Sequence, residues 1–176
     1  YPLSTPRMMS GKGLGTCIDI FAELKKLGKK VCLIVCNAHA NNAMHKQLIA
    51  ETLSYASIKG LSATELIFTS LEEEPTYELG VPKEVVSQLF LLSNLFIFPS
   101  ISENCSLILL EAMLSKCLLV LNNNVGSMRE FGKENALYFN FGIIDDTITY
   151  DNREKYMNDV AKIIVSEFNN NKALKG

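Results

Sequence analysis

The chain has 176 residues, of which 48% are hydrophobic and 20% charged, and this balance is typical of a globular domain rather than of a disordered chain. Seventeen Lys and Arg residues against nineteen Asp and Glu residues leave a net charge of −2, so we expect no nucleic-acid partner, which would require a clustered basic face. The most apolar stretch, residues 105–121, contains Glu111 and Lys116 and is not expected to cross a membrane, which takes about 20 mostly apolar residues.

An alternation of short apolar runs and longer amphipathic segments predicts a parallel sheet with crossover helices. The elements expected in the first half are a short strand ending near Met9, a helix over 14–27 stopped by Gly28, a strand over 31–36, a helix over about 40–58 and a strand over 65–70. The first of these helices should bury one face, formed by Ile18, Phe21, Leu24 and Leu27.

The second half continues the same alternation after an acidic loop at 71–80. The expected elements are a helix from Pro82 to about Ser93, a strand over 95–99, a helix over 106–115, a strand over 118–121, a short helix ending at Phe131, a strand over 136–139 and a helix over 153–168. The pattern predicts a single Rossmann-like α/β domain over 1–168, with a parallel sheet of about six strands and helices on both faces. A polar C-terminal tail should follow at 169–176.

The five cysteines form neither a Cys-x-x-Cys pair nor a metal-ligand spacing, and their odd number favours a reducing compartment. Cys32, Cys36 and His39 are close in sequence, but they do not form a recognisable zinc pattern. We therefore expect structural thiols and no metal.

Polar residues follow several of the predicted strands, at the edge of a parallel sheet where ligands bind. Residues 7–12, 71–80, 100–106 and 122–127 should all lie there. Glu103 should lie on the loop ahead of a helix and Glu111 inside that helix, whose N-terminal N–H groups suit a phosphate. Carboxylates beside a phosphate can accept hydrogen bonds from sugar hydroxyls. A phosphate site flanked by such carboxylates is the pattern expected for binding of a nucleotide sugar.

Four segments carry a resemblance to a known family. They are PRMMSGKG at 6–13, ELIFTS at 65–70, the helix and strand at 81–100 that lead into Glu103 and Glu111, and NVGSMREFGKENALYF at 124–139. In this order the segments resemble the glycosyltransferase group 1 family, with its Arg-x4-Lys-Gly start and its Glu-x7-Glu signature. The family's members are retaining enzymes of the two-domain GT-B type, and the match is to the C-terminal, donor-binding half.

The resemblance implies a role for each matched residue. Arg7 and Lys12 would stabilise the negative charge on the leaving diphosphate, Glu103 would contact the transferred sugar, and Glu111 would hold the ribose hydroxyls. The remaining donor-binding residues would be Gly13, Asn104, Cys105, Ser106 and Leu107. Ser106 could also cap the helix that follows. No metal and no cofactor other than the donor itself are implied.

The function expected from the resemblance is transfer of a sugar from a UDP-, GDP- or ADP-sugar to a glycan or lipid acceptor, with the acceptor held by an N-terminal domain. Such an enzyme of polysaccharide biosynthesis would be cytoplasmic and could associate with the inner face of the membrane, and the isolated domain would be inactive. Two alternatives remain open at this point: a nucleotide-sugar-binding module without transfer activity, and half of an enzyme similar to the UDP-N-acetylglucosamine 2-epimerases.

Overall fold

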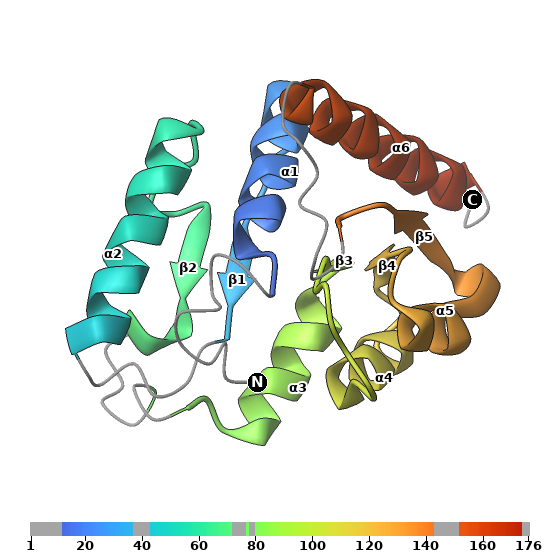
Figure 1. Ribbon diagram of the computed structural model, residues 1–176, viewed down its shortest axis with the longest axis horizontal. Helices are drawn as coiled ribbons and strands as arrows, with labels where there is room; N and C mark the ends of the chain where they lie inside the picture. The colour runs from blue at the N-terminus through green and yellow to red at the C-terminus, as the bar shows by residue number, and fades with distance from the viewer. Residues whose placement is uncertain (1–11, 37–42, 72–76, 78–79, 143–151, 174–176) are drawn as a thin grey trace.

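The computed structural model describes residues 12–36, 43–71, 77, 80–142 and 152–173, and the predicted α/β class is confirmed (Figure 1). The helices are α1 (Leu14–Lys26), α2 (Ala43–Ile58), α3 (Lys83–Leu92), α4 (Leu107–Leu114), α5 (Gly126–Gly132) and α6 (Arg153–Ala173). The strands are β1 (Leu33–Val35), β2 (Leu66–Phe68), β3 (Leu95–Phe98), β4 (Leu118–Asn122) and β5 (Ala136–Phe139), and short 3₁₀ turns lie at Thr69–Leu71 and Lys133–Asn135. In these described ranges, no helix is long and apolar enough to span a membrane.

The described strands form two parallel sheets rather than the single sheet that the sequence predicts. One sheet pairs β1 with β2, and the other has the order β3-β4-β5. The first predicted strand, ending near Met9, lies outside the described residues, and so does most of the acidic loop at 71–80.

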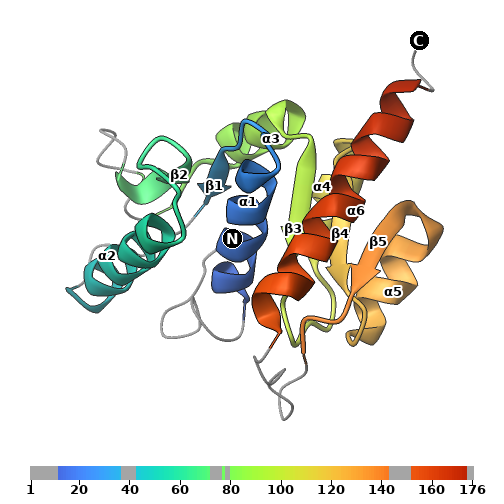
Figure 2. The same ribbon diagram turned by 90° about the horizontal axis from the view of Figure 1, so that it is seen from above.

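Helices cover both faces of the three-stranded sheet, as predicted (Figure 2). Alternate residues of its strands point to opposite faces. Phe96, Phe98, Leu119 and Leu121 pack in a core with side chains of α3, α4 and α5. Leu95, Ile97 and Val120 contribute to the opposite core, with side chains of α1 and α6. Strands covered on both faces are apolar throughout, which is why the sequence shows continuous apolar runs here.

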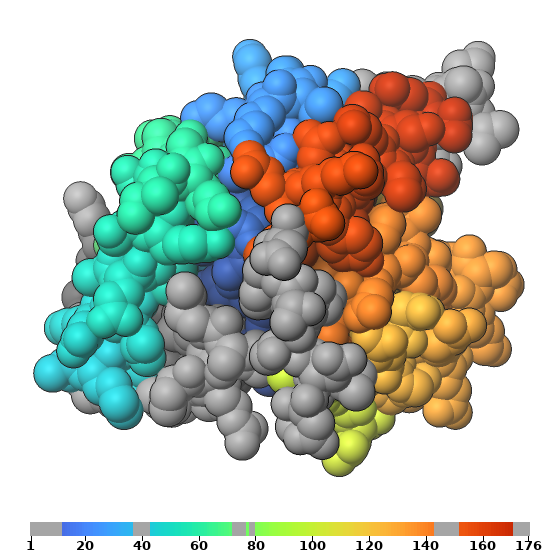
Figure 3. Space-filling model, turned by 45° about the horizontal axis from the view of Figure 1, so that its top comes forward, coloured from blue at the N-terminus to red at the C-terminus, as the bar shows by residue number. Residues whose placement is uncertain are grey.

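Helix α1 is buried on every side from Leu14 to Leu24, although the sequence predicts a single buried face. In the space-filling view α1 lies between α2 and α6 (Figure 3). Ile18 and Phe21 pack into the core shared with α2 and the β1–β2 sheet, whereas Ile20 and Leu24 pack into the core shared with α6 and β4. The helix therefore belongs to both halves of the fold.

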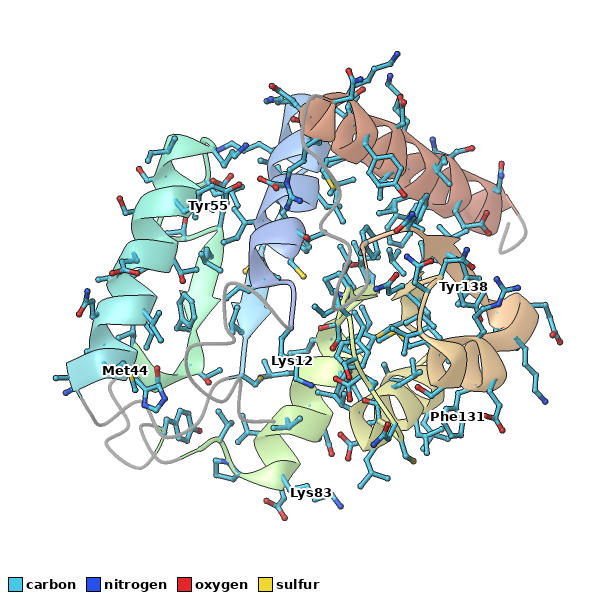
Figure 4. All side chains as sticks on the ribbon, in the orientation of Figure 1. Lys12, Met44, Tyr55, Lys83, Phe131 and Tyr138 are labelled. Carbon is cyan, nitrogen blue, oxygen red and sulfur yellow. The ribbon has the colours of Figure 1, made fainter. Side chains whose placement is uncertain are left out.

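A buried carboxylate, Asp19, joins α1 to both neighbouring helices. Its side chain is 4% exposed and accepts a hydrogen bond from Arg153 Nε of α6 at 2.6 Å and another from the Tyr55 hydroxyl of α2 at 2.6 Å. Lys59 Nζ lies 3.3 Å from the same carboxylate. Figure 4 shows Tyr55 on the side of α2 that faces α1. The predicted apolar face of α1 gave no sign of this ionic contact.

Helix α6 continues to Ala173, past the end at Phe168 that the sequence predicts. The first part of the predicted tail at 169–176 is therefore helical. The preference of the Asn-rich run for turns is overridden by continuation of a helix whose earlier turns, up to Phe168, pack against α1 and the β3–β5 sheet.

We expect Asp19→Asn to lower the free energy of unfolding by about 3 kcal/mol, because it leaves Arg153 and Lys59 without their buried countercharge. The matched control is Asp159→Asn on α6, whose ion pair with Lys162 is exposed and should contribute less than about 1 kcal/mol. Chemical denaturation measures both variants. Equal losses would show that the Asp19 contacts contribute no more than a surface pair.

Candidate functional site

Three segments from distant parts of the sequence meet beyond the end of β3. They are Lys12–Gly13 at the start of α1, residues 99–106 after β3, and residues 122–127 after β4. Their meeting confirms that these loops share one edge of the sheet, as expected for a ligand site in a parallel α/β fold. Figure 4 shows Lys12 near the middle of the molecule, between the β1 side and the β3–β5 side.

The Lys12 ammonium group contacts the carboxylate of Glu103, across 91 positions of sequence. The side chains are 29% and 13% exposed, so the pair is partly shielded from water. The hydroxyl of Ser100 donates a hydrogen bond of 3.0 Å to the same carboxylate oxygen. Two residues that the sequence predicts for one site are thus in direct contact, and their charges neutralise each other when no ligand is bound.

The conformation of Gly13 explains why a glycine follows Lys12. It occupies the N-cap position of α1 with a φ of 73°, in the left-handed region. A Cβ atom placed on it would lie 2.6 Å from Pro99 Cγ and 3.0 Å from the Pro99 carbonyl oxygen. Gly13 therefore allows a close approach to the end of β3, and this approach brings Lys12 next to the loop that carries Glu103.

The N-terminus of α4 faces the same region, but its capping differs from the prediction. Ser106 is at the N-cap position and buried, yet its hydroxyl makes no capping hydrogen bond. Leu109 N–H bonds to the Ser106 carbonyl, while the N–H groups of Leu107 and Ile108 belong to the first turn, where a helix offers no internal acceptor. These N–H groups remain available for an anion, and the partial positive charge of the helix end favours one.

Asn122, at the end of β4, fixes the loop that carries Glu103. Its buried side-chain amide donates to the carbonyls of Ser100 at 3.1 Å and Gly142 at 2.8 Å. Its side-chain oxygen accepts from the N–H groups of Asn124 and Phe141, both at 3.2 Å. From α5, Ser127 donates to the Glu103 carbonyl at 2.8 Å. These supporting residues were not predicted from the sequence. For Asn122 a signal exists, because a polar residue at the end of a buried apolar strand indicates a structural or ligand-binding role.

The predicted site residues are not all brought together. Lys12, Glu103, Cys105, Ser106 and Leu107 line one cavity of about 380 Å³. Asn104 is exposed next to this cavity, and Glu111 is half-buried on α4, one turn beyond the cavity-lining Leu107 and Ile108. Gly13 is buried against Pro99, and Arg7 lies outside the described residues.

Three of the thiols that line the cavity are poor nucleophiles. Burial raises the pKa of Cys17 to about 12, and it also raises the pKa of Cys32 and Cys36. These three thiols remain protonated at neutral pH, so covalent catalysis by any of the three is not supported. Within the described ranges, no group of three or more His, Cys, Asp and Glu side chains could hold a metal ion, while His39 lies outside them.

Comparison with known proteins gives a family match and significant matches to three chains of solved structure. Among curated protein sequences, none matches the chain significantly. A solved structure of trehalose-6-phosphate synthase, OtsA, superposes with a TM-score of 0.48 at 16% sequence identity; the alignment covers 84% of this chain and 37% of that one. The chain thus spans little more than a third of that enzyme's length.

The family comparison covers most of the sequence. The family model described as "Glycosyl transferases group 1" matches residues 2–160, a range that includes all three segments of the candidate site. The chain belongs to the group 1 family of glycosyl transferases.

Proposed function

We propose that this chain is the donor-binding domain of a retaining glycosyltransferase, which transfers a sugar from a UDP-, GDP- or ADP-sugar to a glycan or lipid acceptor. The observation that carries the proposal is the contact between Lys12 and Glu103 beside the open N-terminus of α4. A cation, a carboxylate and free N–H groups at one edge of a parallel sheet provide the complementary groups for a diphosphate linked to a polyhydroxylated sugar.

Each group has a place in donor binding under this proposal. Lys12 and the N–H groups of Leu107 and Ile108 bind the diphosphate, and Arg7 adds a second positive charge from the segment before Lys12. Glu103 accepts hydrogen bonds from the transferred sugar, next to the backbone of residues 104–107. Glu111 accepts hydrogen bonds from the ribose hydroxyls.

The contact between Lys12 and Glu103 implies that donor binding exchanges one partner of Lys12 for another. A diphosphate replaces the Glu103 carboxylate as the partner of Lys12, and the freed carboxylate then turns to the sugar hydroxyls. Binding of the diphosphate half and recognition of the sugar half are coupled in this way, because the first releases the group that performs the second.

The proposed chemistry is electrostatic and needs no metal. The bond from the anomeric carbon to the diphosphate breaks as the bond to the acceptor hydroxyl forms on the same face, and the acceptor proton moves to the leaving diphosphate. Lys12 and Arg7 stabilise the charge that develops on the leaving group. The acceptor binds to a second domain, without which this domain is inactive, and we place the enzyme in the cytoplasm, at the inner face of the membrane, in polysaccharide biosynthesis.

We expect Glu103→Gln to strengthen binding of inorganic pyrophosphate by about three- to tenfold, because Lys12 loses the carboxylate that competes with phosphate. The same variant should weaken binding of a sugar nucleotide relative to the free nucleoside diphosphate. Calorimetry measures all three ligands, and a chelator should change none of the affinities. Unchanged or weaker pyrophosphate binding would contradict the exchange, and loss of binding in chelator would contradict the metal-free site.

We expect Glu111→Gln to weaken binding of a nucleoside diphosphate while leaving pyrophosphate binding unchanged, because only the nucleotide carries ribose hydroxyls. The control is Glu84→Gln, an exposed acid in the first turn of α3, which removes the same charge from another helix. If Glu111 binds no part of the ligand, neither variant should discriminate between pyrophosphate and the nucleotide. Equal effects of Glu111→Gln on pyrophosphate and nucleotide would rule out the ribose assignment.

A further inference from the structure

Ser100 lies just after the end of β3 and is completely buried. Its exposed fraction is 0%, and the residue before it, Pro99, packs against Gly13 at the start of α1. The side chain of Asn122 donates a hydrogen bond of 3.1 Å to the Ser100 carbonyl, so the backbone of Ser100 is also held from β4. The backbone that carries the Ser100 hydroxyl is therefore fixed by the sheet itself.

The Ser100 hydroxyl has two acceptors within reach. Glu103 Oε1 lies 3.0 Å from the hydroxyl oxygen, and the Ser102 carbonyl oxygen lies 3.2 Å from it. Because a hydroxyl has a single proton to donate, these two acceptors compete for it. A charged carboxylate oxygen is the stronger acceptor, but the Lys12 ammonium group neutralises that charge while the two are in contact. The strength of the bond from Ser100 to Glu103 therefore depends on the partner of Lys12.

The two oxygens of the Glu103 carboxylate have different surroundings. Lys12 Nζ and the Ser100 hydroxyl both contact Oε1. Among the residues that the structure describes, none makes a hydrogen bond to Oε2. The Glu103 side chain is 13% exposed and lines the cavity next to the start of α4. One oxygen is thus held by the protein, and the other remains for a ligand in the cavity.

We propose that Ser100 is a positioning residue for donor recognition, which holds Glu103 Oε1 after Lys12 has turned to the diphosphate and leaves Oε2 to accept hydrogen bonds from the sugar. This role rests on the proposed function, in which a diphosphate replaces Glu103 as the partner of Lys12. The exchange takes the countercharge from a carboxylate that is largely shielded from water, and such a charge is costly to leave unpaired. Ser100 offsets that cost, because its proton moves from the Ser102 carbonyl to the carboxylate.

The Ser100 hydroxyl thereby contributes to both halves of donor binding. It lowers the cost of separating Lys12 from Glu103, which favours the diphosphate. It also keeps the released carboxylate in one direction, which favours the sugar, because a glutamate side chain that rotates freely would have to be ordered when the sugar binds. Removal of the hydroxyl should therefore weaken binding of the diphosphate and reduce the additional affinity that the sugar provides.

A purely structural role for Ser100 is the alternative. Serine hydroxyls often bond to nearby backbone groups, and the contact with the Ser102 carbonyl could serve only to stabilise the turn after β3. Loss of the hydroxyl would then loosen the whole loop, and it would affect ligand binding equally whether or not residue 103 carries a charge. The two roles therefore predict different results for a double-mutant cycle between Ser100 and Glu103.

Calorimetry of pyrophosphate binding to the intact chain measures this cycle. Ser100→Ala should weaken binding about fivefold, because Lys12 then leaves a carboxylate that has lost its second partner. In the Glu103→Gln background the same change should alter the affinity by less than about twofold, since no charge is left behind. The matched control is Ser127→Ala, which removes a hydrogen bond of 2.8 Å to the backbone carbonyl of Glu103 and should have the same effect in both backgrounds. Ser100→Cys, with a side chain of similar shape and a weak donor, should reproduce the loss without opening a cavity.

The sugar half of the donor gives a second measurement. The affinity for UDP-glucose relative to UDP, with the GDP and ADP pairs measured alongside, should fall about fivefold in Ser100→Ala and stay unchanged in Ser127→Ala. Equal losses of pyrophosphate affinity in the two backgrounds, or an unchanged preference for the sugar nucleotide, would overturn the positioning role while leaving the proposed function intact. If the unsubstituted chain bound neither pyrophosphate nor any of the nucleotides, the proposed function would be contradicted, and the role of Ser100 with it.

Discussion

The burial of α1 on every side from Leu14 to Leu24 is the constraint on which the rest of the structure depends. This helix packs into two hydrophobic cores, one with α2 and the β1–β2 sheet and one with α6 and β4. A helix enclosed in this way can carry a charge only if the charge is paired, and Asp19 is paired with Lys59, just after α2, and with Arg153 of α6. The ionic contact thus fixes where the neighbouring helices lie along α1, and the N-terminus of α1 then sets the position of Lys12.

The candidate site shows how a weak electrostatic contact can be useful. A partly exposed ion pair contributes little to stability, because the charges are screened and two long side chains must be ordered. Under the proposed function, the pair between Lys12 and Glu103 is exchanged for a ligand at low cost. The supporting contacts are of another kind, since Asn122 and Gly13 hold the backbone of both loops through buried hydrogen bonds and a close approach. Buried contacts thus hold the backbone of the two loops in place, while the charged side chains on them can change partners.

Much of the fold could be predicted from the sequence because local signals and tertiary structure agree. Pro82 precedes α3, Gly28 ends α1 with a φ of 77°, and the continuous apolar runs are strands. The full burial of α1 and the cluster around Asp19 could not be predicted, since a carboxylate on a helix is more often solvated.

The candidate site could also be predicted only in part. Lys12 and Glu103 could be predicted to share one edge, because both lie in segments that the family resemblance matches, and the structure shows them in contact. The prediction that the Ser106 hydroxyl caps α4 was wrong. The direction of a hydroxyl depends on its tertiary environment, which the residue type does not determine. Asn122 and Ser127 were missed because they act on the backbone of another loop. The ligand roles of Arg7 and Glu111 stay predictions.

The most direct test of the donor site is an NMR titration of the chain with UDP, GDP and ADP, following the backbone amide signals. The account predicts that at least one of these nucleotides shifts the amides of Gly13 and of Cys105, Leu107 and Ile108, at the start of α1 and of α4. The amides of Ile34 in β1 and Ile97 in β3 should change little. Shifts centred on these two strands, or no shift with any of the three nucleotides, would contradict the assignment of this edge as a site for a nucleoside diphosphate.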